Sequence, residues 1–222
     1  MSTARTLLSW SSGKDSAFAL ATLRRQAEVD VVALMTTVNA AAGRVAMHAV
    51  RRELLELQAE AVGLPLWTLE IPWPCPNDVY EATMAGAVAR ALGEGITHMA
   101  FGDLFLTEIR AYREAQLAGT GITPIFPLWE RDTRQLADDM VASGTRAVLT
   151  CVDPQQLDAA YAGREFDAEF LAELPPSCDP CGERGEFHTF AWDGPAFRHP
   201  VPVRVGETVT RDGFAFTDVL PA

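Results

Sequence analysis

Short apolar runs alternate with helical patterns over residues 5 to 152, and this alternation limits the folds open to the chain. We expect five of the runs to form buried strands, at 5–10, 29–38, 66–71, 97–101 and 146–152. We expect five helices between them, at 15–26, 48–62, 77–92, 106–118 and 133–143. Strands separated by helices of this length predict βαβ units, and therefore an α/β fold whose parallel sheet is covered by helices on both faces.

The pattern changes after residue 152. Two short helical stretches lead to Pro175-Pro176, and a tail rich in Gly, Pro and aromatic residues follows. Short strands are expected in this tail at 187–192, 196–205 and 208–217, with turns at Asp193-Gly194 and Asp212-Gly213. The sequence therefore predicts a parallel-sheet domain over residues 1–152 and a small α+β region over residues 153–222.

The turn Ser11–Ser16 lies between the first expected strand and the first expected helix. A Gly/Ser-rich turn of this kind brings backbone N–H groups and a helix N-terminus to one point, which favours phosphate binding. Lys14 is the only lysine among the 18 lysines and arginines of the chain, and it lies in this turn. The alternative is an ordinary helix-capping turn with an exposed lysine. Ligands of open parallel sheets bind beyond the carboxyl ends of strands, where the strand order reverses, so this turn is the candidate site.

Charge and composition exclude several classes of protein. The net charge of -12 argues against a nucleic-acid partner, because phosphate backbones need a basic surface. No apolar run approaches the roughly 18 residues of a membrane-spanning helix, and the N-terminus does not read as a signal peptide. Four cysteines are too few for a disulfide scaffold, so we expect a reduced, cytoplasmic protein. The sequence gives no basis for an oligomeric state.

The turn differs from the two commonest phosphate-binding patterns. A Walker A loop requires glycine where Leu8 stands and Ser or Thr where Asp15 stands, and the GxGxxG dinucleotide pattern is absent. The turn resembles instead the SGGxDS signature of the PP-loop ATP pyrophosphatases, which cleave ATP between the α and β phosphates. Ser12 stands where that family usually has glycine, a departure that costs little unless the backbone there needs a positive φ.

Several longer strings resemble one branch of that superfamily, the diphthine–ammonia ligase family. They are Met47-His48, Glu53-Leu54-Leu55, Gln58-Ala59-Glu60, Gly63-Leu64-Pro65-Leu66, Gly102-Asp103 with Arg110 and Glu114, Pro127-Leu128-Trp129, and Cys181-Gly182-Glu183-Arg184-Gly185-Glu186-Phe187-His188-Thr189. The last string is the most specific, and the resemblance extends from about residue 5 to 200. It implies a Rossmann-like fold of the PP-loop type, in which residues 1–152 bind the nucleotide and residues 153–222 lie on the substrate side.

The resemblance also implies a reaction. A carboxylate would be adenylated with loss of pyrophosphate, and ammonia would then displace AMP to give an amide. ATP and Mg²⁺ would be required. Protein-borne diphthine or a small carboxylate would be the acceptor.

The site residues follow from the matched motifs. ATP would contact Ser11, Ser12, Gly13, Lys14, Asp15, Ser16, Met35, Thr37 and Asn39. Mg²⁺ would bind Asp15 and Asp103, whose carboxylate oxygens suit a hard cation. The expected catalytic residues are Lys14, Asp103, Glu183, Glu186 and His188. The expected substrate-binding residues are Arg110, Glu114, Trp129, Gly182 and Gly185.

Plainer interpretations stay open for several of these residues. Asp15 could simply complement a helix N-terminus, and Asp103 could cap a strand end. Glu183, Glu186 and His188 could position ammonia or accept its proton, or they could form a polar edge strand. Cys178-x-x-Cys181 could bind a metal, although free thiols are the preferred interpretation because zinc needs four ligands.

The acidic segment from 153 to 186 has nine carboxylates and two arginines, a net charge of -7. It could steer a cationic substrate such as diphthine toward an aromatic face on Trp192 or Phe187, with Glu169 and Glu173 contributing charge. It could also be only a solubilising surface.

Other functions stay open as well. The Ala/Arg-rich, lysine-poor composition is typical of a GC-rich genome and is compatible with a bacterial homologue. In a bacterium the same machinery would amidate or adenylate something other than diphthine. Thiolation of tRNA uses the same kind of loop with a catalytic cysteine, but the acidic surface opposes it. A regulatory module would bind ATP without releasing pyrophosphate.

Overall fold

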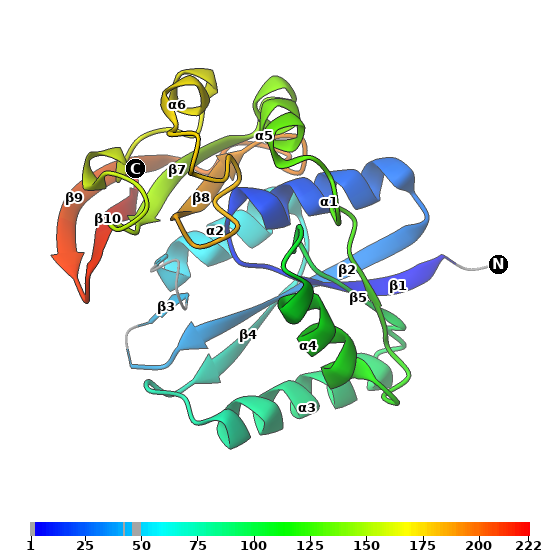
Figure 1. Ribbon diagram of the computed structural model, residues 1–222. Helices are drawn as coiled ribbons and strands as arrows, with labels where there is room; N and C mark the ends of the chain where they lie inside the picture. The colour runs from blue at the N-terminus through cyan, green and yellow to red at the C-terminus, as the bar shows by residue number, and fades with distance from the viewer. Residues whose placement is uncertain (1–2, 42, 46–49) are drawn as a thin grey trace.

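A computed structural model describes residues 3–41, 43–45 and 50–222 (Figure 1). The strands of the first sheet are β1 (Ala4–Ser9), β2 (Val29–Asn39), β3 (Arg44–Val45), β4 (Leu66–Ile71), β5 (His98–Ala100) and β6 (Thr123–Ile125). The strands of the second sheet are β7 (Arg146–Val152), β8 (Phe187–Asp193), β9 (Val203–Arg211) and β10 (Phe214–Pro221). The helices are α1 (Lys14–Gln26), α2 (Arg52–Val62), α3 (Asn77–Gly93), α4 (Thr107–Leu117), α5 (Thr133–Ala142), the 3₁₀ helix η1 (Ala159–Tyr161) and α6 (Ala168–Glu173).

The first sheet is parallel apart from the short strand β3. Its centre is β1, which pairs in parallel with β2 on one side and with β5 on the other. The chain runs outward from β1 through β2 to β4, and then returns across the sheet to β5 and β6. The strand order therefore reverses between β1 and β5, so the turn that follows β1 lies at the position where such sheets bind ligands.

Helices cover both faces of this sheet (Figure 1). Successive residues of β1 point to opposite faces, and Leu8 packs into one core with α1 and α2 while Leu7 packs into another with α3 and α4. Both leucines are at most 2% exposed. The apolar run in β1 therefore has no solvent face, which confirms the predicted α/β fold with a parallel sheet covered on both sides.

The prediction that Arg146–Val152 continues the parallel sheet is wrong. This strand, β7, lies in the second sheet and pairs in the antiparallel sense with β8 and β10. A strand that is buried on both faces shows the same continuous apolar run in a parallel sheet and in an antiparallel sheet. The hydrophobic pattern of β7 therefore could not show which sheet it would join. The strand pairing shows that the chain passes from the first sheet to the second between β6 and β7. The predicted domain boundary between residues 152 and 153 stays a prediction.

Two predicted strands of the tail have wrong boundaries. The strand expected at 196–205 begins only at Val203, because Pro200 and Pro202 have no N–H to donate to a sheet. The strand expected at 208–217 is in fact a hairpin, in which β9 and β10 meet at the predicted turn Asp212-Gly213. Met47 and His48, where the second helix was expected to begin, lie outside the described residues.

The two sheets share one core. Phe187 and Phe190 of β8 belong to the same buried cluster as Phe18 of α1. The N–H of Ala191 in β8 also donates to the carbonyl oxygen of Ser12 at 2.9 Å. The second sheet is therefore fixed directly against the turn that follows β1. In the part of the chain described by the structure, no helix is both long and apolar enough to span a membrane.

Candidate active site

The turn Ser11–Ser16 is held by its own hydrogen bonds. Ser11 Oγ donates to Ser16 Oγ at 3.2 Å and accepts from the N–H of Gly13 at 3.3 Å. Ser16 Oγ donates to the carbonyl oxygen of Gly13 at 2.9 Å. Helix α1 begins at Lys14, and the first N–H groups of a helix have no acceptor inside the helix. The turn thus presents a helix N-terminus, which suits an anion.

The end of β5 approaches this turn closely. A Cβ atom at Gly102 would lie 3.3 Å from both the carbonyl carbon of Asp15 and the backbone nitrogen of Ser16. Glycine therefore lets the two backbone segments approach closely, whereas any other residue would force them apart by a few tenths of an ångström. This approach places Asp103, the next residue, beside the turn.

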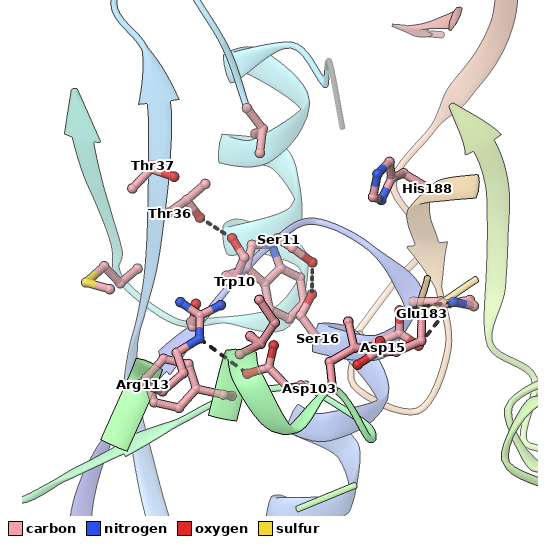
Figure 2. Close-up of a pocket in the computed structure, with 18 of the residues that line it drawn as sticks. Trp10, Ser11, Asp15, Ser16, Thr36, Thr37, Asp103, Arg113, Glu183 and His188 are labelled. Carbon is pink, nitrogen blue, oxygen red and sulfur yellow. Dashed lines mark hydrogen bonds and ion pairs between the residues drawn. The ribbon is translucent and has the colours of Figure 1, made fainter. Parts of the chain in front are cut away.

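A cavity of about 550 Å³ opens where these elements meet. Its lining includes ten of the residues predicted from the sequence, namely Ser11, Lys14, Asp15, Ser16, Met35, Thr37, Asp103, Gly182, Glu183 and His188. Figure 2 shows Asp15 and Glu183 close together on one side of the cavity and Asp103 near them. The structure thus brings the turn after β1 and the C-terminal string into one site.

Asp103 has a partner that the sequence did not indicate. Its Oδ2 lies 3.3 Å from Nε of Arg113, whose guanidinium also lies over the ring of Phe101 at 4.8 Å (Figure 2). The sequence motif had indicated Arg110, on the same helix, as a site residue. The two arginines are three residues apart, so only the rotation of α4 against the sheet decides which one reaches the cavity.

Several predicted residues lie outside the cavity lining. Arg110 pairs with Glu114 at 2.8 Å and lies over the rings of Phe126 and Trp129, so the three predicted substrate-binding residues form a separate cluster. Asn39 accepts a hydrogen bond from the N–H of Ala41 at the end of β2. A role for these four residues in binding stays a prediction.

Glu183 is the most perturbed carboxylate of the site. Its Oε1 accepts a hydrogen bond at 2.8 Å from the N–H of Leu104, which lies in the segment that follows β5. Burial raises the pKa of Glu183 to about 7, and the charges of Asp15 and Asp103 act in the same direction. A carboxyl group that titrates near neutral pH can both accept and release a proton, as general catalysis requires.

Glu186 is placed differently. It is 1% exposed and does not line the cavity. Its two carboxylate oxygens accept the N–H groups of Asp179 and Arg184 at 2.8 and 2.9 Å. This geometry fits a group that shapes the turn carrying Glu183. Gly185, also outside the lining, has φ of 85° within the same turn.

Each of the two aromatic rings that were predicted to bind a cationic substrate is in contact with a cationic side chain of this protein. The ring of Phe187 lies 5.3 Å from Nζ of Lys14, and the ring of Trp192 lies 4.7 Å from the guanidinium carbon of Arg146. Glu173 forms an ion pair with Arg164. Steering of a cation by the acidic segment stays a prediction.

The cysteines of the Cys178-x-x-Cys181 motif are both buried. Burial raises the pKa of Cys178 to about 12 and also raises that of Cys181, so both are protonated thiols at neutral pH. Among the described residues, no group of three or more His, Cys, Asp or Glu side chains could hold a metal.

Ser12 occupies the position that needs a positive φ. Its φ is 69°, and its buried Oγ has no hydrogen-bond partner among the described residues. The replacement of glycine by serine in this turn therefore costs stability, through left-handed backbone and an unsatisfied hydroxyl.

We expect Ser12→Gly to raise the free energy of unfolding by about 1–2 kcal/mol, measured by urea denaturation. Ser12→Ala removes only the hydroxyl and should give the smaller part of the gain. A destabilised Ser12→Gly protein would show that the hydroxyl is satisfied in solution, for example by a buried water.

Comparisons of the sequence with known proteins indicate one family. The family model described as diphthamide synthase N-terminal domain matches residues 4–115, and the diphthamide synthase C-terminal domain matches residues 132–218. Proteins named diphthine–ammonia ligase are similar across most of the chain. The Bos taurus protein is 27% identical over 180 residues (74% of this chain and 67% of its own). The Danio rerio protein is 27% identical over 186 residues (77% and 72%), and the Homo sapiens protein 26% over 180 residues (74% and 67%). The two family models together cover the turn after β1 and the Glu183 string, and the chain belongs to the diphthamide synthase family.

Proposed function

We propose that this chain is an ATP-dependent ligase that joins ammonia to a carboxylate and releases AMP and pyrophosphate. The observation that carries the proposal is that the phosphate-type turn, Asp103 and Glu183 line one cavity. The relatives named diphthine–ammonia ligase support the same reaction class.

The cavity fits ATP in size and chemistry. Its volume of about 550 Å³ lies within the range of roughly 300–1,000 Å³ that is typical of small-molecule sites. The α1 N-terminus and the hydroxyls of Ser11 and Ser16 suit the phosphates, while Met35 and Thr37 provide a wall for the adenine.

The cavity also fits Mg²⁺. Asp15 and Asp103 both line it, and Mg²⁺ usually takes one or two carboxylates together with substrate phosphates. Bound there, the ion would offset negative charge on the leaving pyrophosphate.

The reaction follows in two steps. An oxygen of the acceptor carboxylate attacks the α-phosphorus, and the bond to the β-phosphate oxygen breaks to release pyrophosphate. The nitrogen of ammonia then attacks the acyl carbon and AMP leaves. Glu183 takes the proton that the nitrogen loses, a role suited to its raised pKa. Thiolation through Cys151 or Cys178 is disfavoured because burial raises the pKa of each thiol to about 12.

Product analysis tests the proposal. We expect AMP and pyrophosphate from ATP, Mg²⁺, ammonium chloride and a diphthine-bearing acceptor protein, resolved by chromatography and phosphorus NMR. Asp103→Asn should slow their formation at least tenfold, whereas Asp138→Asn, an exposed change on α5, should not. Formation of ADP and phosphate would refute cleavage between the α and β phosphates.

A further inference from the structure

Lys14, the only lysine of the chain, is almost completely buried. Its ammonium donates to both carboxylate oxygens of Asp15 at 3.0 and 3.1 Å and to the carbonyl oxygen of Cys181 at 2.5 Å. Its backbone N–H donates to Oγ1 of Thr189 at 3.1 Å. Lys14 is thus bonded to the C-terminal string from both its main chain and its side chain.

The surroundings of the ammonium favour this position. The rings of Phe166 and Phe187, both at most 2% exposed, lie 5.2 and 5.3 Å from Nζ. Burial lowers the pKa of Lys14, but the charge of Asp15 and its hydrogen bond, with further contributions from Cys181 and Glu183, together outweigh burial, so the pKa of Lys14 lies above its ordinary value. A buried ammonium is stable only while its partners remain, so moving it to a phosphate would leave the carbonyl of Cys181 without its charged donor.

The carbonyl that Lys14 holds lies at the start of the turn that presents Glu183. Gly182 has φ of 70°, and a Cβ atom there would lie 2.8 Å from the carbonyl oxygen of Phe187, so the turn has little freedom. Glu183 is fixed on its other side by the N–H of Leu104. The two anchors, one from the turn after β1 and one from the end of β5, hold the Glu183 carboxylate at the cavity.

We propose that Lys14 is a positioning residue: its ammonium holds the Cys181–Glu183 turn against the nucleotide loop, and it keeps its bond to the carbonyl oxygen of Cys181 when nucleotide and Mg²⁺ bind. The proposal rests on the proposed function, in which Glu183 takes the proton from the attacking nitrogen. It departs from the expectation that the lysine of such a loop binds phosphate.

The single lysine makes the ammonium directly observable. Protein labelled with [15N]lysine should give one slowly exchanging ammonium signal, with nuclear Overhauser contacts to the rings of Phe166 and Phe187. We expect these contacts to persist when α,β-methylene-ATP and Mg²⁺ bind. Loss of the ring contacts in the nucleotide complex would overturn the proposal. This measurement needs no turnover, so it stands even if no amide is formed.

Variants give a second test. Lys14→Met keeps the length of the side chain and removes the charge. We expect its affinity for α,β-methylene-ATP, by calorimetry, to stay within threefold of wild type. AMP formation with a diphthine-bearing protein and ammonium chloride should fall at least 100-fold through kcat. Lys14→Arg, which keeps a cation, should recover part of this loss.

A double-mutant cycle identifies the residue through which Lys14 acts. If it acts through Glu183, Lys14→Met with Glu183→Gln should be no slower than Glu183→Gln alone. A tenfold loss of nucleotide affinity in Lys14→Met, with additive losses in kcat, would instead identify a phosphate ligand.

Discussion

Glu183→Gln should slow amide formation by about 10²- to 10⁴-fold, the usual contribution of a general base, while nucleotide affinity changes only a few-fold. The reason is local: glutamine can still accept the N–H of Leu104 through its amide oxygen, but it cannot take a proton from the attacking nitrogen. Glu108→Gln, an exposed change on α4, serves as the control. Equal loss of nucleotide affinity and rate would show that Glu183 acts in binding instead.

The same substitution should change the pH dependence of stability. The pKa of Glu183 is about 7 in the folded protein against 4.5 ordinarily, so the folded state binds more protons between these values. Stability therefore falls as pH rises from about 4.5 to 7, because the unfolded chain ionises more easily. Glu183 is partly exposed, so we expect this loss to be about 1–2 kcal/mol rather than the full shift.

Glu183→Gln should remove that loss, and the variant should be more stable than wild type at pH 8 but not at pH 4. Urea denaturation at the two pH values measures the difference. A pH dependence shared by wild type and variant would show that Glu183 does not titrate abnormally.

Gln58→Leu should cost about 3 kcal/mol of stability. Gln58 on α2 is fully buried, accepts Nε1–H of Trp10 at 2.9 Å, and donates to the carbonyl oxygens of Ser12 at 3.0 Å and Ala191 at 2.5 Å. Leucine fills the volume but leaves the buried Nε1–H of Trp10 without its acceptor and removes one donor from each carbonyl oxygen, of which that of Ser12 keeps the N–H of Ala191. A buried group left without a partner costs about 1–3 kcal/mol. Because the three bonds join the nucleotide loop to both β8 and α2, nucleotide affinity should fall with stability.

Urea denaturation and calorimetry with α,β-methylene-ATP measure the two effects. Trp10→Phe removes the indole hydrogen bond together with part of the buried ring and should cost about 1–2 kcal/mol. Because Gln58 and Trp10 share that bond, the double variant should lose less than the sum of the two single changes. Fully additive losses would mean that the buried indole has another partner.

Local sequence was sufficient to predict the scaffold of the site. The apolar run of β1, the Gly/Ser turn and the pattern of α1 are adjacent in the chain, so their geometry follows from short-range preferences. Gly102-Asp103 was predicted to lie at the site from its resemblance to the family's motif. It follows β5, which pairs in parallel with β1, so it lies at the edge of the sheet where the carboxyl ends of these strands meet. The matched strings then indicated that the Glu183 turn belongs to the same site.

Tertiary structure alone decided how individual side chains are used. Arg113 rather than Arg110 faces Asp103, because the rotation of α4 depends on its packing against the sheet. Glu183 lines the cavity while Glu186, three residues later, shapes the turn from inside, because the path of that turn depends on contacts with distant elements. β7 joined the antiparallel sheet because strand pairing is a long-range choice between equally apolar partners.

For Lys14, the sequence determined that the one lysine of the chain lies in the phosphate-type turn; folding determined that its ammonium is bonded to Asp15 and to the carbonyl of Cys181. The first fact depends on neighbouring residues. In the second, the bond to Asp15 joins adjacent residues, whereas the bond to Cys181 depends on packing between segments about 170 positions apart, which no local pattern encodes.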